Sequence, residues 1–423
     1  MAWQYCQTQG GRMRGSSVPG EKHIQGNPLE CHLRMFAAAL QEAGYRDRTM
    51  CSKLRLLADL GSWLKRTGQS FASHLEEHLL EAFVKHKQRI QQMHGGDSKT
   101  LQQFLTHLRM QGVVSDRKLV LDQSPLAVIL GSYEQHLLLE RKLSSATIFN
   151  YLSFARRFLI ERFSKGPLLL KEIEASDISD FVLRRGRTMG VGTAQIMTTA
   201  FRSFFRYLLQ KGELQADLAA CVPAVADWRL STVPKYVTTE EVERVLKACN
   251  RNTAIGRRDY AVLLLVARLG LRAGEVVALQ LEDINWRASE ILVRGKGMLH
   301  ERMPLPADVG EALASYLRQD RPPCQTRRVF VCTRAPRRSF VRSCAVSLII
   351  RRALLRAELD PPVKGAHLFR HSLATSLLRS GAKMEEIGEV LRHRDSGTTE
   401  IYAKVDFDGL RSVAHPWPIG GAQ

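Results

Sequence analysis

A helical periodicity that occurs twice in the first half of the chain most constrains the fold. Between residues 28 and 112, apolar residues recur at steps of three and four, as in SKLRLLADLGSWLKR, and residues 126–212 have the same texture. This spacing places apolar side chains along one face of an α-helix. Each stretch is therefore predicted to form a small bundle of amphipathic helices.

The two stretches can also be aligned with each other. With shifts of 98 and 100 residues, similar residues coincide in several pairs, among them Leu54 with Leu152, Phe83 with Phe181, Leu108 with Leu208, and Gly112 with Gly212. The two glycines are expected to end the last helix of each copy. We interpret the pattern as an internal duplication of a four-helix unit. The alternative is a chance alignment of amphipathic helices.

A proline-containing stretch separates these units from a third region with a different texture. Pro223 and Pro234 indicate a linker, and a capping box from Thr238 to Glu241 begins the next helix. EILVR at 290–294, the turn GKGM and HERMPL at 300–305 predict a β-hairpin, with VFVC at 329–332 as a third strand. The predicted fold is mainly α, with two tandem four-helix units followed by a mixed α+β domain that contains a small antiparallel sheet.

The predicted boundaries follow from these features. They are a flexible basic leader at 1–27, a first helical domain at 28–115, a second at 124–215, a linker at 216–234, the third domain at 235–415 and a tail at 416–423.

The charge of the chain favours a polyanionic partner. Its 423 residues include 62 Lys and Arg against 42 Asp and Glu, a formal net charge of +20. Nucleic acid is the usual partner of such a surplus, and the alternative is a merely basic soluble protein. No apolar run is long enough to cross a bilayer and no secretory signal is present. The eight cysteines are scattered without a CxxC motif, so a cytoplasmic location without a membrane partner is expected.

Six residues of the third region combine the chemistry needed to cut a phosphodiester: Arg272, Lys296, His367, Arg370, His393 and Tyr402. A phenol can attack the phosphorus, cations can stabilise the non-bridging oxygens, and an acid can protonate the leaving oxygen. Because the cations come from the protein, neither a metal nor another cofactor is expected. The pair His74 and His78 has a spacing suited to a metal, but a solvated helix face explains it better.

The local contexts of these residues suit those roles. Arg272 lies where a buried helix breaks at Gly270 and a new helix begins, and Glu275 one turn later can form an ion pair with it. Lys296 lies at the glycine-flanked tip of the hairpin, although turns rich in Gly and Lys are common.

The remaining residues lie in two further segments. His367 and Arg370 share a helix face, whereas His371 is expected to face elsewhere and to have a structural role. Thr398 and Thr399 offer an N-cap for a short helix carrying Tyr402. Seven arginines and no acid lie between Arg321 and Arg342, which predicts either a solvated basic loop or DNA-backbone contacts.

Taken together, these motifs resemble the tyrosine recombinase family, the phage-integrase-like and Xer-like site-specific recombinases. The resemblance covers about residues 235–415 and includes LGLRAGE, the GKGMLHERMPL hairpin, HLFRHSLAT and LRHRDSGTTEIYAKV. The 124–215 region resembles, less closely, the helical core-binding domain of that family, so the first unit would be its duplicate. One departure is visible: the family usually has glycine before the second histidine, where this chain has Arg392.

The resemblance implies a mechanism and partners. Tyr402 would attack the scissile phosphate to give a 3′-phosphotyrosyl bond, with Lys296 as the acid and Arg272, Arg370 and His393 stabilising the phosphate. His367 would act as a base or an orienting donor. The expected partners are double-stranded DNA, three further copies in a homo-tetramer, and sister recombinases of the same mobile element.

Three readings of the function remain open. A recombinase would serve integration, excision or transposition. A type IB topoisomerase would use the same chemistry to relax DNA, and a catalytically silent accessory protein would only bind it. The sequence does not identify the target site.

Overall fold

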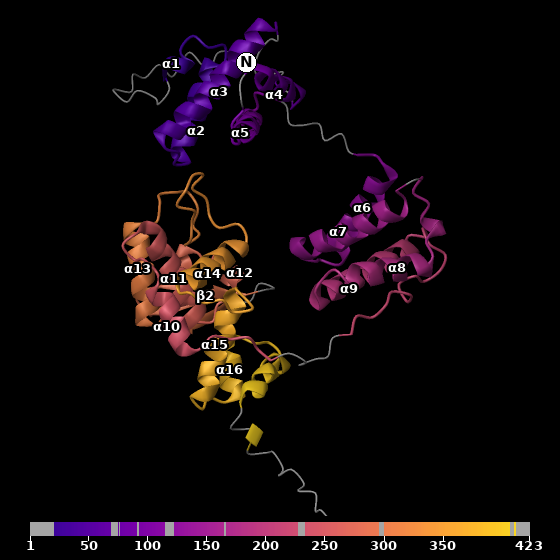
Figure 1. The fold of residues 1–423 in the computed structure, drawn as a ribbon, viewed down its shortest axis with the longest axis vertical. Coiled ribbons are helices and arrows are strands. Elements are labelled where there is room, and N and C mark those ends of the chain that lie inside the picture. The colour runs from indigo at the N-terminus through magenta and orange to yellow at the C-terminus, as the bar shows by residue number, and fades with distance from the viewer. Residues whose placement is uncertain are drawn as a thin grey trace, which may run out of the picture. The chain divides into compact units, whose positions relative to one another are not determined.

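The computed structural model describes residues 21–68, 75, 77–90, 93–114, 122–164, 166–226, 233–295, 300–406 and 410–411. The described chain is mainly helical, with one small antiparallel sheet, as the sequence predicts (Figure 1). Its buried apolar residues form separate cores in residues 24–114, 130–222 and 237–405. Lys296, most of the leader and the tail from 416 lie outside the described residues.

The first helical unit consists of α1 (Glu21–Ile24), α2 (Glu30–Glu42), α3 (Asp47–Arg66), α4 (Glu77–Ile90) and α5 (Asp97–Met110). Phe36 and Phe104 pack edge to face in its core. Residues 21–27, which the sequence assigned to the leader, belong to this core, because Ile24 is fully buried and Asn27 donates a hydrogen bond to the carbonyl of Ala58.

The second helical unit lies within residues 116–231, which form a compact unit of their own. It consists of α6 (Pro125–Gln135), the π-helix η2 (His136–Glu140), α7 (Ser145–Arg162), η3 (Leu170–Glu172), α8 (Ala175–Gly186) and α9 (Val191–Gln210). Phe158 makes edge-to-face contacts with Phe181, Phe201 and Phe205 at 5.5–5.7 Å between ring centroids. Val222 also lies in this core, which therefore extends beyond residue 215.

The last helices of the two units end in the same way. Gly112 and Gly212 adopt φ values of 68° and 75°, which glycine tolerates best. The amide of Val113 then donates to the carbonyl of Leu108, and that of Glu213 donates to the carbonyl of Leu208, both at 3.0 Å. These equivalences agree with a duplication, which stays a prediction.

The third domain begins with α10 (Thr239–Lys247), which starts at the predicted capping box of Thr238 and Glu241. It continues with α11 (Ala254–Arg268), α12 (Ala273–Ala278), η4 (Leu281–Asp283), the sheet, α13 (Ala307–Gln319), α14 (Cys344–Arg356), α15 (Ala366–Arg379), α16 (Met384–Leu391), η5 (Ser396–Thr398) and η6 (Glu400–Val405). The central helix, α11, contacts α10, α12, α13, α14 and α15. Its position explains the almost unbroken apolar run in its sequence.

The sheet has the order β1 (Ile284–Asn285), β2 (Glu290–Arg294) and β3 (His300–Pro304). The predicted hairpin is β2–β3, with Leu292 opposite Arg302. The prediction of a third strand at 329–332 was wrong, because β1 takes that place. The backbone N–H groups of that segment donate to carbonyls in different parts of the domain. Val329 donates to the carbonyl of Leu279 and Cys332 to that of Arg338, so no continuous β-ladder forms.

Candidate active site

The first wall of the site begins where α11 ends. Gly270 has φ 59°, and a Cβ there would lie 2.9 Å from the Cδ2 atom of Leu391, so both the backbone conformation and the close packing require glycine. Arg272 follows as the N-cap of α12, as predicted. Its side chain keeps 39% of its surface exposed and forms the predicted ion pair with Glu275 at 2.8 Å.

Glu275 is the buried anion of this wall. Its Oε1 atom accepts from Arg272 Nη1, and its Oε2 atom accepts from the Arg272 backbone N–H at 2.9 Å and from Arg392 Nη2 at 2.9 Å. Burial alone would raise the pKa of Glu275, but the hydrogen bonds from Arg272 and the charge of Arg392 hold this pKa below its ordinary value.

Arg370 on α15 links the backbone at Gly270, just after α11, with the backbone at Leu391, the end of α16. It is 3% exposed, and it donates from Nη1 to the carbonyl of Gly270 at 2.7 Å and from Nη2 to the carbonyl of Leu391. Burial, together with the charges of Arg272 and Arg392, lowers the pKa of Arg370 to about 10. The crowded cations with one shared carboxylate form a site prepared for an anion.

His367 lies on the same helix as Arg370, as predicted, and is exposed. Desolvation of the ring by the surrounding protein lowers the pKa of His367, and the charges of Arg370 and Arg272 lower this pKa further. The imidazole is therefore mostly neutral at pH 7.

Tyr402 lies on η6 in a small separate core with Ile387 and Leu391, and it is 1% exposed. Burial raises the pKa of Tyr402 to about 12, against the opposing charges of Arg370 and Arg272. In this conformation the phenol is protonated, not a phenolate.

His371 is the hydrogen-bond partner of Tyr402. Its Nδ1 atom lies 2.9 Å from the phenol oxygen, and the two rings meet edge to face at 5.7 Å. The sequence predicted that His371 faces elsewhere than His367 and Arg370 and has a structural role; its contact with Tyr402 was not expected, and its role stays a prediction. His371 follows Arg370 directly and points to the adjacent side of α15, which η6 covers; only the packing of η6 on α15 reveals this contact.

His393 also contacts Tyr402, with its ring parallel to the phenol at 6.5 Å between centroids. Its Nδ1 atom is 2.8 Å from Thr399 Oγ1. Thr399 is the N-cap residue of η6, as predicted, but its hydroxyl orients His393 instead of capping the helix. Burial, followed by the charges of Arg370 and Arg272, lowers the pKa of His393 to about 4, so the ring is neutral at pH 7.

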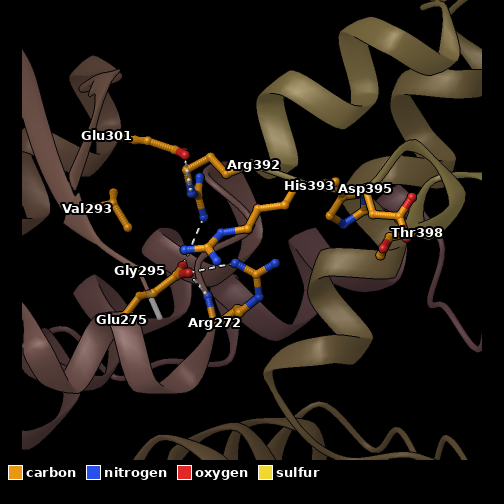
Figure 2. Close-up of a pocket in the computed structure, with 10 residues that line it drawn as sticks. Arg272, Glu275, Val293, Gly295, Glu301, Arg392, His393, Asp395 and Thr398 are labelled. Carbon is orange, nitrogen blue, oxygen red and sulfur yellow. Dashed lines mark hydrogen bonds and ion pairs between the residues drawn. The ribbon is translucent and has the colours of Figure 1, made fainter. Parts of the chain in front are cut away.

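A cavity of about 310 Å³ opens beside these residues and is lined by Arg272, Glu275, Gly295, Arg392 and His393, among others. Figure 2 shows the guanidinium of Arg272 and the ring of His393 on two sides of this space. Gly295 precedes Lys296 in the sequence, so the described part of the hairpin leads to this cavity.

The arginine-rich segment from 321 to 342 has a partly structural role. Arg321 donates to the carbonyls of Thr326, Arg328 and Val329, and Arg327 pairs with Glu282. Arg334, Arg338 and Arg342 are exposed and remain candidates for contact with a DNA backbone.

Among the described residues, no group of three or more His, Cys, Asp or Glu side chains is placed to hold a metal ion. No helix in this part of the chain is long and apolar enough to cross a membrane.

The candidate site thus combines a buried tyrosine that contacts two neutral histidines with a group of arginines near a cavity. The model described as "Phage integrase family" matches residues 235–408, and "Phage integrase, N-terminal SAM-like domain" matches residues 130–212. The chain is 43% identical over 398 residues to "Putative integrase/recombinase y4rA" of Sinorhizobium fredii, covering 94% of this chain and 96% of that protein. It is 32% identical to tyrosine recombinase XerD of Mycobacterium tuberculosis, covering 69% and 98%.

The chain therefore belongs to the phage integrase family of tyrosine recombinases and is a site-specific recombinase that acts on DNA. A crystal structure of the XerH site-specific recombinase bound to palindromic difH substrate, in a post-cleavage complex, has the same fold. Its TM-score is 0.53 at 17% identity, covering 95% of this chain and 97% of that one. The family resemblance and the enzyme class expected from the sequence are confirmed.

Proposed function

We propose that this recombinase cuts each DNA strand by attack of the Tyr402 phenol oxygen on a scissile phosphate. The observation that carries the proposal is the environment of the phenol: its oxygen lies 2.9 Å from Nδ1 of His371, its ring lies parallel to that of His393, and the charges of Arg370 and Arg272 act on it. The new P–O bond joins the 3′-phosphate to Tyr402, and the bond to the 5′ oxygen breaks. Lys296 donates a proton to that leaving oxygen, and the phenol proton passes to a neutral histidine.

The charge of the site supports the binding of a phosphodiester. Arg272, Arg370 and Arg392 surround a single buried carboxylate, that of Glu275. A phosphate would relieve the repulsion that lowers the pKa of Arg370, and its oxygens would take the donors that Arg272 leaves exposed. His367 and His393 would donate to the same oxygens. The protein's cations supply the electrostatic stabilisation, so no metal or cofactor is required.

The assembly and the outcome of the reaction follow from this chemistry. The phosphotyrosyl bond conserves the energy of the broken phosphodiester, so a 5′-hydroxyl from a second duplex can reverse the step and exchange strands. Two duplexes carry four strands to cut, which is the reason for a homo-tetramer on double-stranded DNA. Integration, excision and transposition share this step, and sister recombinases can supply some of the four protomers.

A nicked suicide duplex tests the nucleophile and the metal requirement together. The nick lets the leaving strand diffuse away, so a covalent complex accumulates in EDTA, and mass spectrometry of its peptides places the nucleotide on Tyr402. An adduct on another residue, or activity lost in EDTA and restored by magnesium, would contradict the proposal.

A second substrate tests Lys296. Lys296→Ala should lose most cleavage of normal DNA but recover it on a 5′-phosphorothiolate, whose sulfur leaves without a proton donor. Failure of the sulfur substrate to restore cleavage would remove Lys296 from this role.

The first helical unit is proposed to be a duplicate of the core-binding unit and to contact DNA outside the core site. Arg55, Lys65, Arg66 and Lys85 are exposed on its helices. Lys53, in contrast, is held by Thr100 and Gln103 and is not available. In the full chain, Lys65→Ala with Lys85→Ala should reduce the salt dependence of binding by a slope of roughly 0.9 per lost phosphate contact. An unchanged slope would instead indicate a protein–protein module.

A further inference from the structure

Arg392 has a backbone conformation that favours glycine. It follows α16 with φ 56° and ψ 51°, in the left-handed region. Two backbone hydrogen bonds end the helix. The amide of Arg392 donates to the carbonyl of Glu389, and the amide of His393 donates to the carbonyl of Gly388, both at 2.9 Å. A residue with a Cβ is disfavoured there, so the side chain must gain contacts that outweigh the strain.

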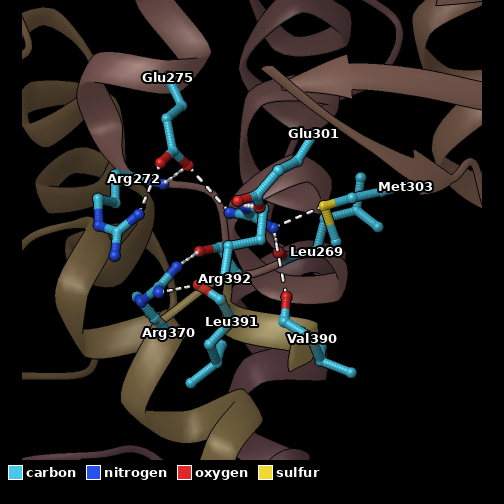
Figure 3. A network of polar contacts seen from close by, with 10 residues as sticks. Leu269, Arg272, Glu275, Glu301, Met303, Arg370, Val390, Leu391 and Arg392 are labelled. Carbon is cyan, nitrogen blue, oxygen red and sulfur yellow. Dashed lines mark hydrogen bonds and ion pairs between the residues drawn. The ribbon is translucent and has the colours of Figure 1, made fainter. Parts of the chain in front are cut away.

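Those contacts are made inside the protein. The Arg392 side chain is 6% exposed, and its Nη2 atom donates to Glu275 Oε2 at 2.9 Å. Its Nη1 atom lies 3.4 Å from the carbonyl of Leu269 and also contacts the sulfur of Met303. Figure 3 shows the guanidinium between these groups. One side chain thus joins the end of α11, the first turn of α12 and strand β3.

The contact with Glu275 bears directly on Arg272. The same carboxylate receives the backbone N–H and the Nη1 group of Arg272. Without Arg392, the carboxylate would lose one of its two guanidinium partners and could rotate, and Arg272 would lose a fixed orientation. The contact with Met303 lies on the strand that follows Lys296 in the hairpin.

We propose that Arg392 is a positioning residue, which clamps Glu275 against Arg272 and holds β3 beside α12. Its side chain is only 6% exposed where it borders the cavity, so it acts through Glu275 and β3 and not through a contact of its own with the DNA. This role rests on the proposed function, in which Arg272 contacts the scissile phosphate. The residue therefore acts on the rate of cleavage and not on the affinity for DNA.

A double-mutant cycle tests the clamp in the full-length protein. Single-turnover cleavage of a nicked duplex and DNA affinity are measured for Arg392→Gly, Glu275→Gln and the double variant. Arg392→Gly relieves the backbone strain, which offsets part of the stability lost with the side-chain contacts, and it should slow cleavage roughly 10- to 100-fold through misplacement of the reacting groups. DNA affinity should stay within about twofold, and the double variant should be no slower than the slower single variant, because the two residues act as one unit.

Two further variants separate positioning from general stability. Arg392→Lys keeps the charge near Glu275 but cannot reach all three acceptors, so it should recover part of the rate lost in Arg392→Gly. Arg268 is the matched control, since it also bridges two carboxylates of the same domain, Glu243 and Asp308. Arg268→Ala should cleave at the wild-type rate.

The outcomes distinguish this inference from the function on which it rests. If wild-type protein cleaves and Arg392→Gly cleaves equally fast, or if the two single effects multiply in the double variant, the clamp is overturned. If wild-type protein forms no covalent complex with the nicked duplex, the proposed function itself is overturned.

Discussion

The two walls of the active site are stabilised in opposite ways. The wall formed by α12 and β3 is ionic: Arg272 and Arg392 share the carboxylate of Glu275, and the Arg272 side chain remains 39% exposed. Apart from Arg370, which joins the two walls, the wall formed by α15 and η6 is neutral: Tyr402 contacts two histidines whose pKa values are lowered to about 4. The first wall is prepared to receive an anion, whereas the second keeps the proposed nucleophile protonated.

Because of this difference, the phenol of Tyr402 stays protonated although cationic side chains lie in the same site. Burial raises the pKa of Tyr402, while the charges of Arg370 and Arg272 lower it. Since Tyr402 is 1% exposed, the proposed attack would require a shift of η6 that brings the phenol oxygen to a phosphate. Its core contains few buried residues, so such a shift disrupts little packing.

Among the variants that test the two walls, Tyr402→Phe should reduce DNA cleavage the most. It removes the phenol oxygen and leaves the cationic wall intact, so covalent capture of a nicked duplex should disappear while DNA binding persists. Capture is measured by denaturing gel and binding by mobility shift. A protease-resistant DNA adduct in the Phe variant would show that the neutral wall does not supply the nucleophile.

Arg370→Lys should have the next largest effect, because Arg370 is the point where the two walls meet. Lysine cannot bond the carbonyls of Gly270 and Leu391 and a phosphate at once. Single-turnover cleavage should fall by roughly 10²- to 10³-fold, as for loss of a preorganised oxyanion donor. Near-normal cleavage in the Lys variant would mean that charge alone matters at this position.

His371→Ala tests the neutral wall and should have a smaller effect on cleavage than Arg370→Lys. The phenol of Tyr402 loses its hydrogen-bond partner, and cleavage should slow by roughly 10-fold or more if His371 orients the phenol or takes its proton. His371→Gln, which keeps an acceptor in reach, should retain more activity than His371→Ala. Equal activity of wild type and His371→Ala would make the contact a resting-state feature only.

The smallest expected effect is on stability at acid pH. Burial holds the pKa values of His371 and His393 at about 4, below the usual 6.5. Between these pH values the two histidines bind protons in the unfolded chain but not in the folded protein. The free energy of unfolding therefore decreases as pH falls from 6.5 towards 4. The free energy of unfolding should drop by on the order of 1 kcal/mol per histidine between pH 7 and pH 5, after allowance for solvent screening.

Urea denaturation at both pH values measures this loss, with His371→Asn as the control. The Asn variant should lose less stability than wild type on acidification. An identical loss in both proteins would show that His371 is not protected from protonation.

The sequence by itself determined the parts of this protein that depend on local order. The 3.6-residue periodicity predicted the helical units, the capping box marked the start of α10, and the glycine-flanked hairpin lies where the strand pattern placed it. The Arg272–Glu275 ion pair was also predictable, because residues three apart on a helix are neighbours. The family followed from motifs whose order and spacing can be read directly.

Only the tertiary structure decided which groups face one another across long sequence separations. The contact of His371 with Tyr402, the use of Thr399 to orient His393, and the clamp from Arg392 to Glu275 depend on how α15, α16, η6 and α12 pack. The third strand was mistaken for the same reason, since residues 329–332 are apolar enough for a strand but find no single partner. Periodicity specifies which face of an element is buried, and only packing specifies what that face meets.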